Sequence, residues 1–341
     1  QQDEVVRSMT FIDGRNTLLL SGLAVEGAQT TTGPAYQGCN VGTDPFGGDF
    51  WLGSMSFDLT TLNAARAHGG AGCERPYYSC IERADNTVCC AGHTESAGIT
   101  GALNAYPGGN TSGWLACYSA DLTTVLAGRY VGGTGADTCR GGVMELAGGD
   151  VLCIGQAGST STGLGTPGVY QQTHGGGASE GIACAFSSDL ATTQWCTYLG
   201  SGSGSQTEII AAGFEEPDGD LVFLSSSPDS AWIQARRTAG ANASGTQSLP
   251  FLARLSAGAT TLEALVPIGP EGQTVVGPLF QEPSVVQAPD GSYYVAGTTE
   301  GAIDFGSFAL GAPVEVDELG QGDRLLPRSL LWFRSRRRWL G

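Results

Sequence analysis

Only three histidines are available for acid–base or metal chemistry in this sequence: His68, His93 and His174. A hydrolase needs a nucleophile, a base and an orienting acid, and none of the three lies in a Gly-x-Ser-x-Gly or His-Glu-x-x-His pattern. Structural or solvent-facing histidines are therefore favoured over a metal set. We predict no catalytic residue, no metal site and no cofactor, and we expect the protein not to be an enzyme.

Acidic residues are plentiful, and one cluster has the composition of a calcium loop. Residues 215–220 read Glu-Glu-Pro-Asp-Gly-Asp, four carboxylates together with the turn formers Pro and Gly. They lack the Asp-x-Asp-x-Asp-Gly frame of a calcium loop and occupy a hairpin-turn position of the repeat described below. A turn is favoured, and an ion site is the alternative.

All ten cysteines lie between residues 39 and 196, without the spacing of a zinc finger or ribbon. An even number in a glycine-rich acidic chain indicates disulfides made in an oxidising compartment. We expect Cys184 and Cys196 on facing strands, with Cys153 as the alternative partner of Cys184 because directly opposed cysteines strain the bond. The disulfide candidates are Cys39, Cys73, Cys80, Cys89, Cys90, Cys117, Cys139, Cys153, Cys184 and Cys196.

Charge and composition exclude several classes of partner. The formal net charge is −17, which disfavours nucleic acid and anionic lipid surfaces. No apolar run approaches the roughly 18 to 20 residues of a membrane span. The sequence begins at Gln1 rather than Met, from which we expect that a signal peptide has been removed. Together with the cysteines, this predicts an extracellular or cell-surface protein.

One apolar block recurs five times at a spacing of roughly seventy residues, which is typical of propeller or solenoid units. A turn-forming pair such as Asp85-Asn86, Gly148-Gly149 or Asp218-Gly219 precedes most copies, so each unit is expected to open with a β-hairpin. The five copies are residues Leu18 to Gly22, Val88 to Gly92, Val151 to Gly155, Leu221 to Ser225 and Tyr293 to Gly297.

A second block repeats in the latter half of the units, with large, small and large residues at alternate positions. Period two indicates a strand, and the small residue lets a packed sheet interdigitate. Residues at the same position of successive repeats, which we call a column, are therefore expected to be buried in equivalent places. The two columns are Leu18, Val88, Val151, Leu221 and Tyr293, and Trp51, Trp114, Ile182 and Phe251. The alternating sets are Trp51, Gly53, Met55; Trp114, Ala116, Tyr118; Ile182, Cys184, Phe186; and Phe251, Ala253, Leu255.

These blocks predict an all-β fold, a β-propeller of about five four-stranded antiparallel blades in a single domain. A closed ring hides both faces of each sheet, so it is favoured over an open β-solenoid or paired sandwiches. The predicted repeats are residues 1–72, 73–138, 139–206, 207–278 and 279–341.

The repeat resembles the SBBP class of bacterial β-propeller repeats. The similarity rests on a middle element at residues 33–37 and 166–171, an exit at residues 197–200, a glycine linker at residues 132–135, and a third strand at residues 250–255 with Arg254 in the lysine position. It weakens at residues 234–248 and 311–327. The resemblance implies a module of secreted or surface bacterial proteins, usually with seven blades, and implies no catalytic motif.

Two function classes remain: a structural or adhesive surface protein that binds other copies, surface proteins or glycans, and a secreted lyase or glycosidase acting on polysaccharide. We favour the first, because no acidic residue or histidine departs from the repeat template. The basic, aromatic C-terminus suggests head-to-tail assembly against an otherwise acidic body. The alternative is that Leu330 to Phe333 forms the last strand and the arginines pair with carboxylates of the same ring. Its contact candidates are Arg328, Trp332, Arg334, Arg336, Arg337, Arg338 and Trp339.

Overall fold

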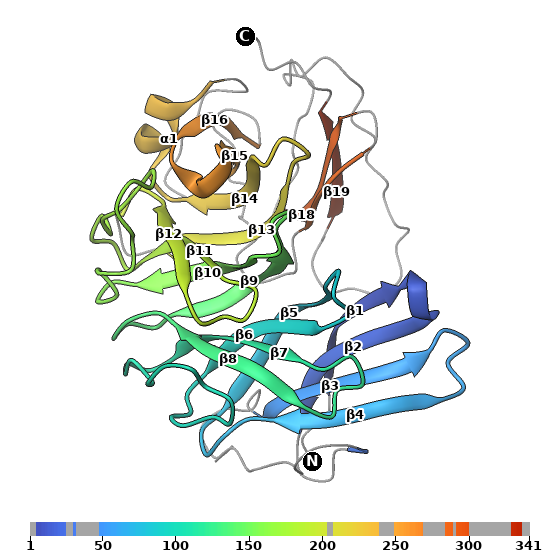
Figure 1. Cartoon of the computed structure of the whole chain (residues 1–341). Helices are drawn as coiled ribbons and strands as arrows, with labels where there is room; N and C mark the ends of the chain where they lie inside the picture. Colours follow the sequence, from blue (N-terminus) through green and yellow to red (C-terminus); the bar gives the residue numbers. More distant parts are fainter. Residues whose placement is uncertain are drawn as a thin grey trace, which may run out of the picture. The chain divides into compact units, whose positions relative to one another are not determined.

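The computed structural model describes residues 5–24, 30–31, 48–202, 207–238, 249–268, 284–288, 291–299 and 329–335. Its strands form five antiparallel sheets that follow one another along the chain, and in each sheet consecutive strands are neighbours (Figure 1). The fold is all-β and of the β-propeller type, with four-stranded antiparallel blades. Each sheet begins within a few residues of a predicted repeat boundary.

The first sheet contains β1 (Val5–Ile12), β2 (Thr17–Ala24), β3 (Asp49–Ser56) and β4 (Leu62–His68). The second contains β5 (Glu74–Glu82), β6 (Val88–Thr94), β7 (Ser112–Tyr118) and β8 (Val125–Val131). The third contains β9 (Thr138–Glu145), β10 (Val151–Gly158), β11 (Ser179–Phe186) and β12 (Thr193–Leu199).

The fourth sheet contains β13 (Ile209–Glu215), β14 (Leu221–Ser227), β15 (Leu249–Leu255) and β16 (Leu262–Pro267), and α1 (Ser230–Arg236) follows β14. The fifth has three described strands, β17 (Ser284–Gln287), β18 (Tyr293–Thr299) and β19 (Ser329–Ser335). Short 3-10 turns occupy Asp13–Arg15 and Ala257–Ala259.

The chain divides into two compact units. The first comprises residues 1–164 and 183–196, and the second comprises residues 165–182 and 197–341. The single domain expected from the repeats stays a prediction.

The hairpin turns form as their residue types predict. Asn86, Gly149, Gly219 and Gly291 all have positive φ, the conformation that such tight turns require. In the first sheet a longer turn, residues 13–16, joins the first two strands and ends on Asn16, which also has positive φ. The turn chemistry therefore sets the start of the second strand of every sheet.

A second turn recurs between the third and fourth strands and places an ordinary side chain at positive φ. In the second sheet the Asp121 carboxylate accepts hydrogen bonds from the Ser119 hydroxyl at 2.6 Å and the Thr123 amide at 3.1 Å. This arrangement holds Leu122 at a φ of 59°. The equivalent residues Leu59, Leu190 and Ala259 have the same left-handed conformation.

The predicted core columns occupy equivalent register positions. Trp51 pairs with Gly22, Trp114 with Gly92 and Phe251 with Ser225. The column formed by Leu18, Val88, Val151, Leu221 and Tyr293 is buried throughout, as are Trp114, Ile182 and Phe251.

Trp51 is the exception, because it is only half-buried. In the first unit, side chains of the first sheet such as Leu19 and Leu52 pack in one cluster with Trp114, Ala116 and Tyr118 of the second. The first sheet uses its other face for this contact. Trp51 lies on the face turned away from it, so the expected burial of Trp51 is wrong.

Four disulfides join neighbouring strands of the second and third sheets: Cys80–Cys90, Cys89–Cys117, Cys139–Cys153 and Cys184–Cys196. Cys90 bonds to β5 on one side of β6 and Cys89 bonds to β7 on the other, and the two disulfides lie on opposite faces of the sheet because successive strand residues point to opposite faces. The alternative pairing of Cys184 with Cys153 is wrong. Cys184 and Cys196 have a Cα–Cα distance of 4.1 Å, the close approach of a non-hydrogen-bonded strand pair.

Candidate functional site

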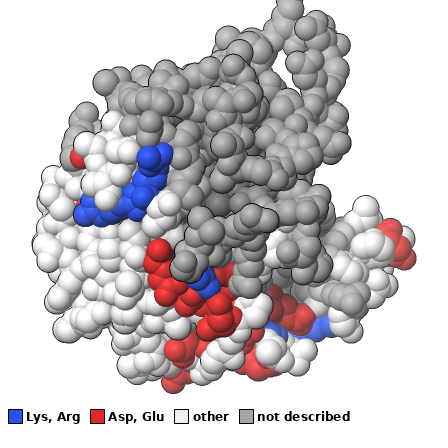
Figure 2. Space-filling view, turned by 90° about the horizontal axis from the view of Figure 1, so that it is seen from above, with Lys and Arg blue, Asp and Glu red and all other residues white. Residues whose placement is uncertain are grey.

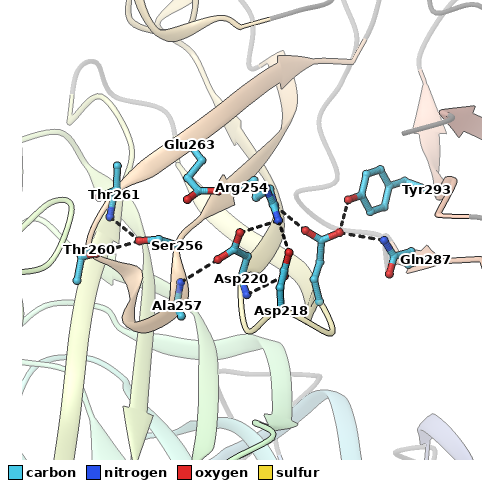
Figure 3. Close-up of polar contacts among 11 residues, drawn as sticks. Asp218, Asp220, Arg254, Ser256, Ala257, Thr260, Thr261, Glu263, Gln287 and Tyr293 are labelled. Carbon is cyan, nitrogen blue, oxygen red and sulfur yellow. Dashed lines mark hydrogen bonds and ion pairs between the residues drawn. The ribbon is translucent and has the colours of Figure 1, made fainter. Parts of the chain in front are cut away.

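The acidic hairpin turn between β13 and β14 is built around Arg254 of β15 (Figure 3). The guanidinium lies 2.5 Å from the buried Glu216 carboxylate, 2.8 Å from Asp218 and 2.6 Å from Asp220. Glu263 of β16 is a fourth partner at 3.1 Å. One fixed cation thus lies among four carboxylates.

Oxygen atoms of Glu216, Asp218 and Asp220 lie within 4.8 Å of one another, a spacing suited to a metal ion. Arg254 supplies positive charge at this place. Glu216 also accepts hydrogen bonds from Tyr293 at 2.5 Å and Gln287 at 2.9 Å. These contacts make the cluster a junction between the fourth and fifth sheets. Arg254 is the residue that stands in the lysine position of the SBBP-like strand.

Buried carboxylates hold the glycine linkers that lead into the second, third and fourth sheets. Glu74 accepts from the Gly70 amide at 3.2 Å, and Asp137 accepts from the Gly133 amide at 2.7 Å. Glu208 accepts from the amides of Ser201 and Gly202, both at 3.1 Å. A hydroxyl from the end of the second strand, or just beyond it, completes each brace: Thr94, Ser161 and Ser227.

Glu74 and Asp49 form a buried acidic pair in the first unit. Neither residue has exposed surface, and a Cβ added at Gly69 would collide with both carboxylates. Burial raises the pKa of Glu74 to about 8, and the nearby Asp49 carboxylate acts in the same direction. Glu74 is therefore mostly protonated at pH 7, where an exposed glutamate is charged.

Glu180 in the second unit is also buried, and burial raises its pKa. It accepts hydrogen bonds from the Gly175 amide at 3.0 Å and from Gln171 Nε2 at 3.1 Å. His174 Nδ1 lies 3.8 Å from it and accepts the Gly176 amide at 3.0 Å. Because Nδ1 is an acceptor, the neutral ring carries its proton on Nε2. Gln171, from the SBBP-like middle element, links Glu180 to the loop after β12.

The three histidines are buried in separate surroundings. His68 lies between the Tyr118 hydroxyl at 2.7 Å and the Thr100 carbonyl at 3.0 Å, and burial lowers its pKa to about 4. Burial likewise lowers the pKa of His93 to about 3. Both rings are neutral at pH 7 and act as packing and hydrogen-bonding groups.

Arginines that sequence reasoning overlooked connect successive sheets of the first unit. Arg15 donates to the carbonyls of Asn86 at 2.9 Å and Ala120 at 3.1 Å. Arg83 repeats this one sheet further on, with Gly149 and Ser188. A second series of arginines lies on the fourth strands of the first and second sheets.

In that series Arg66 donates to the Leu122 carbonyl at 2.7 Å and Arg129 to the Leu190 carbonyl at 2.9 Å. The sequence contained a clue to these arginine–carbonyl contacts, because its Lys and Arg residues are all Arg. A guanidinium can serve several carbonyls at once, which an ammonium does less well.

The C-terminal contact candidates fall largely outside the described residues. The described residues exclude Arg328, Arg336, Arg337, Arg338 and Trp339, and for Trp332 and Arg334 in β19 they include the backbone alone. Cys39 is likewise outside. On the face shown in Figure 2, acidic side chains form the larger coloured area and basic side chains form smaller patches.

No known family model matches the chain, and no curated protein matches it. Membership of the SBBP class therefore stays a prediction. A solved protein of unknown function from Dyadobacter fermentans is similar at 13% identity and a TM-score of 0.46, over 88% of this chain and 77% of that one. A protein of unknown function from Bacteroides caccae has 8% identity and a TM-score of 0.44, over 88% and 73%.

The polysaccharide lyase Uly1 has 9% identity and a TM-score of 0.42, over 98% of this chain and 57% of that one. No function follows from these similarities.

Proposed function

We propose that this protein is a non-catalytic extracellular or cell-surface interaction module, which assembles with further copies of itself through its basic C-terminal end. Other surface proteins or glycans are the remaining class of partner. The competing hypothesis is a secreted lyase or glycosidase that acts on polysaccharide.

The observation that carries the proposal is the use of the buried ionisable groups. Glu74, Glu180 and Glu208 have the raised pKa values that general acids need, but none has exposed surface. Each accepts backbone amides of a glycine-rich loop, and such contacts recur from sheet to sheet. A repeated bracing role accounts for these groups without a substrate.

The disulfides support the extracellular location. Four cross-strand disulfides are more than is expected of a protein from a reducing compartment, where cysteine thiols are kept reduced. No helix in the described part of the chain is long and apolar enough to cross a membrane.

Charge separation supports self-assembly. The last fourteen residues carry five arginines and no acidic residue, which leaves eleven basic against 33 acidic residues elsewhere. A basic end that meets an acidic body of the next copy uses two different patches, so it produces open chains or rings rather than closed dimers.

The test compares the intact protein with a variant in which Arg336, Arg337 and Arg338 are changed to Ser. Light scattering at low and high salt should show large particles only for the intact protein at low salt, because salt screens the attraction. Monomers under all conditions would refute self-assembly.

A second measurement addresses the competing enzyme hypothesis. Incubation with neutral and uronate-containing polysaccharides should release neither new reducing ends nor unsaturated uronate products. Turnover that disappears in Glu74→Gln or Glu180→Gln, with folding retained, would show that a braced carboxyl is catalytic and would refute the proposal.

A further inference from the structure

Two carboxylic acids lie in one buried space between the first and second sheets. Asp49 begins β3 and Glu74 begins β5, and both residues are 0% exposed. The Glu74 amide donates to the Gly48 carbonyl at 2.7 Å, which joins the two sheets at this point. A Cβ at Gly69 would collide with a carboxyl oxygen of each acid, so the two oxygens face the same small volume. All of these residues belong to the first unit.

The hydrogen-bond donors of Glu74 are neutral groups. Its Oε1 accepts the Thr94 hydroxyl at 2.7 Å and its Oε2 accepts the Gly70 amide at 3.2 Å, and the Ser96 hydroxyl is a third partner. Within the described ranges, no arginine pairs with this carboxyl group. Two adjacent carboxyl groups away from water cannot both be charged without a large cost. These contacts therefore suit a protonated Glu74 beside a charged Asp49.

The other ionisable groups around Glu74 do not supply a compensating charge. Tyr130 of β8 is neutral, because burial raises its pKa, and its hydroxyl contacts two backbone groups at 3.0 Å. His68 at the end of β4 is also neutral and makes its hydrogen bonds elsewhere. Arg75 follows Glu74 in β5, so its side chain points to the opposite face. Among the described residues, Asp49 is the charge that acts on Glu74.

The next junction along the chain has only one acid at the equivalent positions. Ser112 begins β7 as Asp49 begins β3, and each stands two residues before the tryptophan of its strand. Asp137 accepts an amide of the glycine linker there, as Glu74 does at its own linker. One acid is thus sufficient to hold a linker, so the second acid at the first junction has a separate effect.

We propose that Asp49 and Glu74 form a proton-dependent latch between the first and second sheets, which holds residues 69–73 while the pair carries a proton and releases them when the proton is lost to solvent. This inference is independent of the proposed function. Loss of the proton leaves two neighbouring buried carboxylates, which must move apart or take up water. Either change breaks the bond to the Gly70 amide.

The pH range of the latch follows from the two states of the linker. In the closed form the pKa of Glu74 is about 8, whereas a hydrated glutamate in the open form has its ordinary value of 4.5. Opening therefore releases a proton at any pH between these values. Each pH unit in that range should favour the open form about tenfold more, and the effect should level off above pH 8.

The test measures amide hydrogen exchange of residues 69–74 from pH 5 to 9, expressed as protection relative to the intrinsic rate at each pH. Protection in the wild type should fall about tenfold for each pH unit up to pH 8 and then stay constant. In Glu74→Gln it should not depend on pH. In Asp49→Asn it should level off at a lower pH, because the charge that raises the pKa of Glu74 is gone.

Asp137→Asn is the matched control, since it removes the brace of the next linker and should leave the wild-type profile of residues 69–74 intact. Circular dichroism establishes that each variant is folded. Constant protection in the wild type, or a Glu74→Gln variant that keeps the slope, would overturn the latch. An unchanged profile in Asp49→Asn would show that the two acids do not act as a pair. Equal protection of residues 69–74 and β7 would show that the linker opens only when the sheet unfolds, which would also refute the proposal.

Discussion

Single carboxylates in this protein are buried in two chemically different ways. Glu74 accepts amide and hydroxyl groups at a glycine linker beside a second carboxylate, and its pKa is raised. Glu216 lies against the Arg254 guanidinium and two further donors. A bound proton keeps Glu74 uncharged, whereas the Arg254 guanidinium compensates the negative charge of Glu216. Changes of pH and substitutions should therefore affect the two residues differently.

Glu74→Gln should remove part of the pH dependence of stability. The pKa of Glu74 is about 8 in the folded chain, against 4.5 for an ordinary glutamate. Its contribution to stability is therefore fully present below pH 4.5 and is lost as the pH rises to about 8. At pH 7 the wild type should have lost about 3 kcal/mol through this group.

Thermal unfolding of wild type and variant from pH 4 to 9 measures the effect, and the difference between the two curves should change in favour of Glu74→Gln as the pH rises. Glu95→Gln, at an exposed position, is the control. Parallel curves for wild type and Glu74→Gln would contradict the raised pKa.

Arg254→Met should destabilise the second unit by about 3 kcal/mol, because it leaves the buried Glu216 beside three further carboxylates without their shared cation. Chemical denaturation at pH 7 measures the loss. Calcium should recover part of it in the variant and have little effect on the wild type, whose guanidinium already lies there. The exposed Arg236→Met is the matched control, and equal stability of Arg254→Met and wild type would show that the cluster does not depend on Arg254.

At the scale of elements, the turn between the third and fourth strands depends on contacts that sequence patterns do not contain. The Asp-Gly and Asn turns follow known rules for positive φ. Leucine at positive φ in Leu59, Leu122 and Leu190 does not, since side chains with a Cβ are strained there. Side-chain hydrogen bonds from Ser and Thr to the turn Asp stabilise the conformation.

The pair Leu59→Gly and Leu122→Gly separates conformational strain from burial. Both positions have a φ near 60°, but Leu59 is exposed and Leu122 is fully buried. Leu59→Gly should change stability by about 0.5–1 kcal/mol in the stabilising direction, because glycine is unstrained there. Leu122→Gly should destabilise by about 2–4 kcal/mol through lost packing. Denaturation of dilute protein measures both, and a stabilised Leu122→Gly would contradict the packing argument.

At the scale of the whole molecule, the described disulfides are distributed unevenly. All four lie in the first unit, and none among the described residues lies in the second. The two units therefore differ in what stabilises them. Cross-strand bonds reinforce one, whereas the other depends on packing and on the Arg254 cluster.

Reduction should consequently destabilise only the first unit. Calorimetry should show two transitions, of which one moves to lower temperature in reductant, since each lost disulfide costs about 2–4 kcal/mol. Arg254→Met should lower the other transition. A single transition that shifts as a whole would contradict the independence of the two units. Non-reducing peptide mapping provides the control for the four pairings.

Local rules explain which parts of this protein were predictable. The period-two alternation and the turn pairs identify the strands, their order and the equivalent core columns, because these properties depend on neighbouring residues and recur in each repeat. The same alternation places Cys89 and Cys90 on opposite faces. The net acidity and the excess of cysteine also follow from the sequence.

Tertiary structure decided what depends on residues distant in the chain. Arg254 lies among carboxylates that are up to 38 positions away from it, and Glu74 acquires its pKa from burial beside Asp49. Neither environment appears in a local pattern. Trp51 occupies the same register position as Trp114 but differs in burial, because burial depends on a neighbouring sheet and not on the strand's own residues.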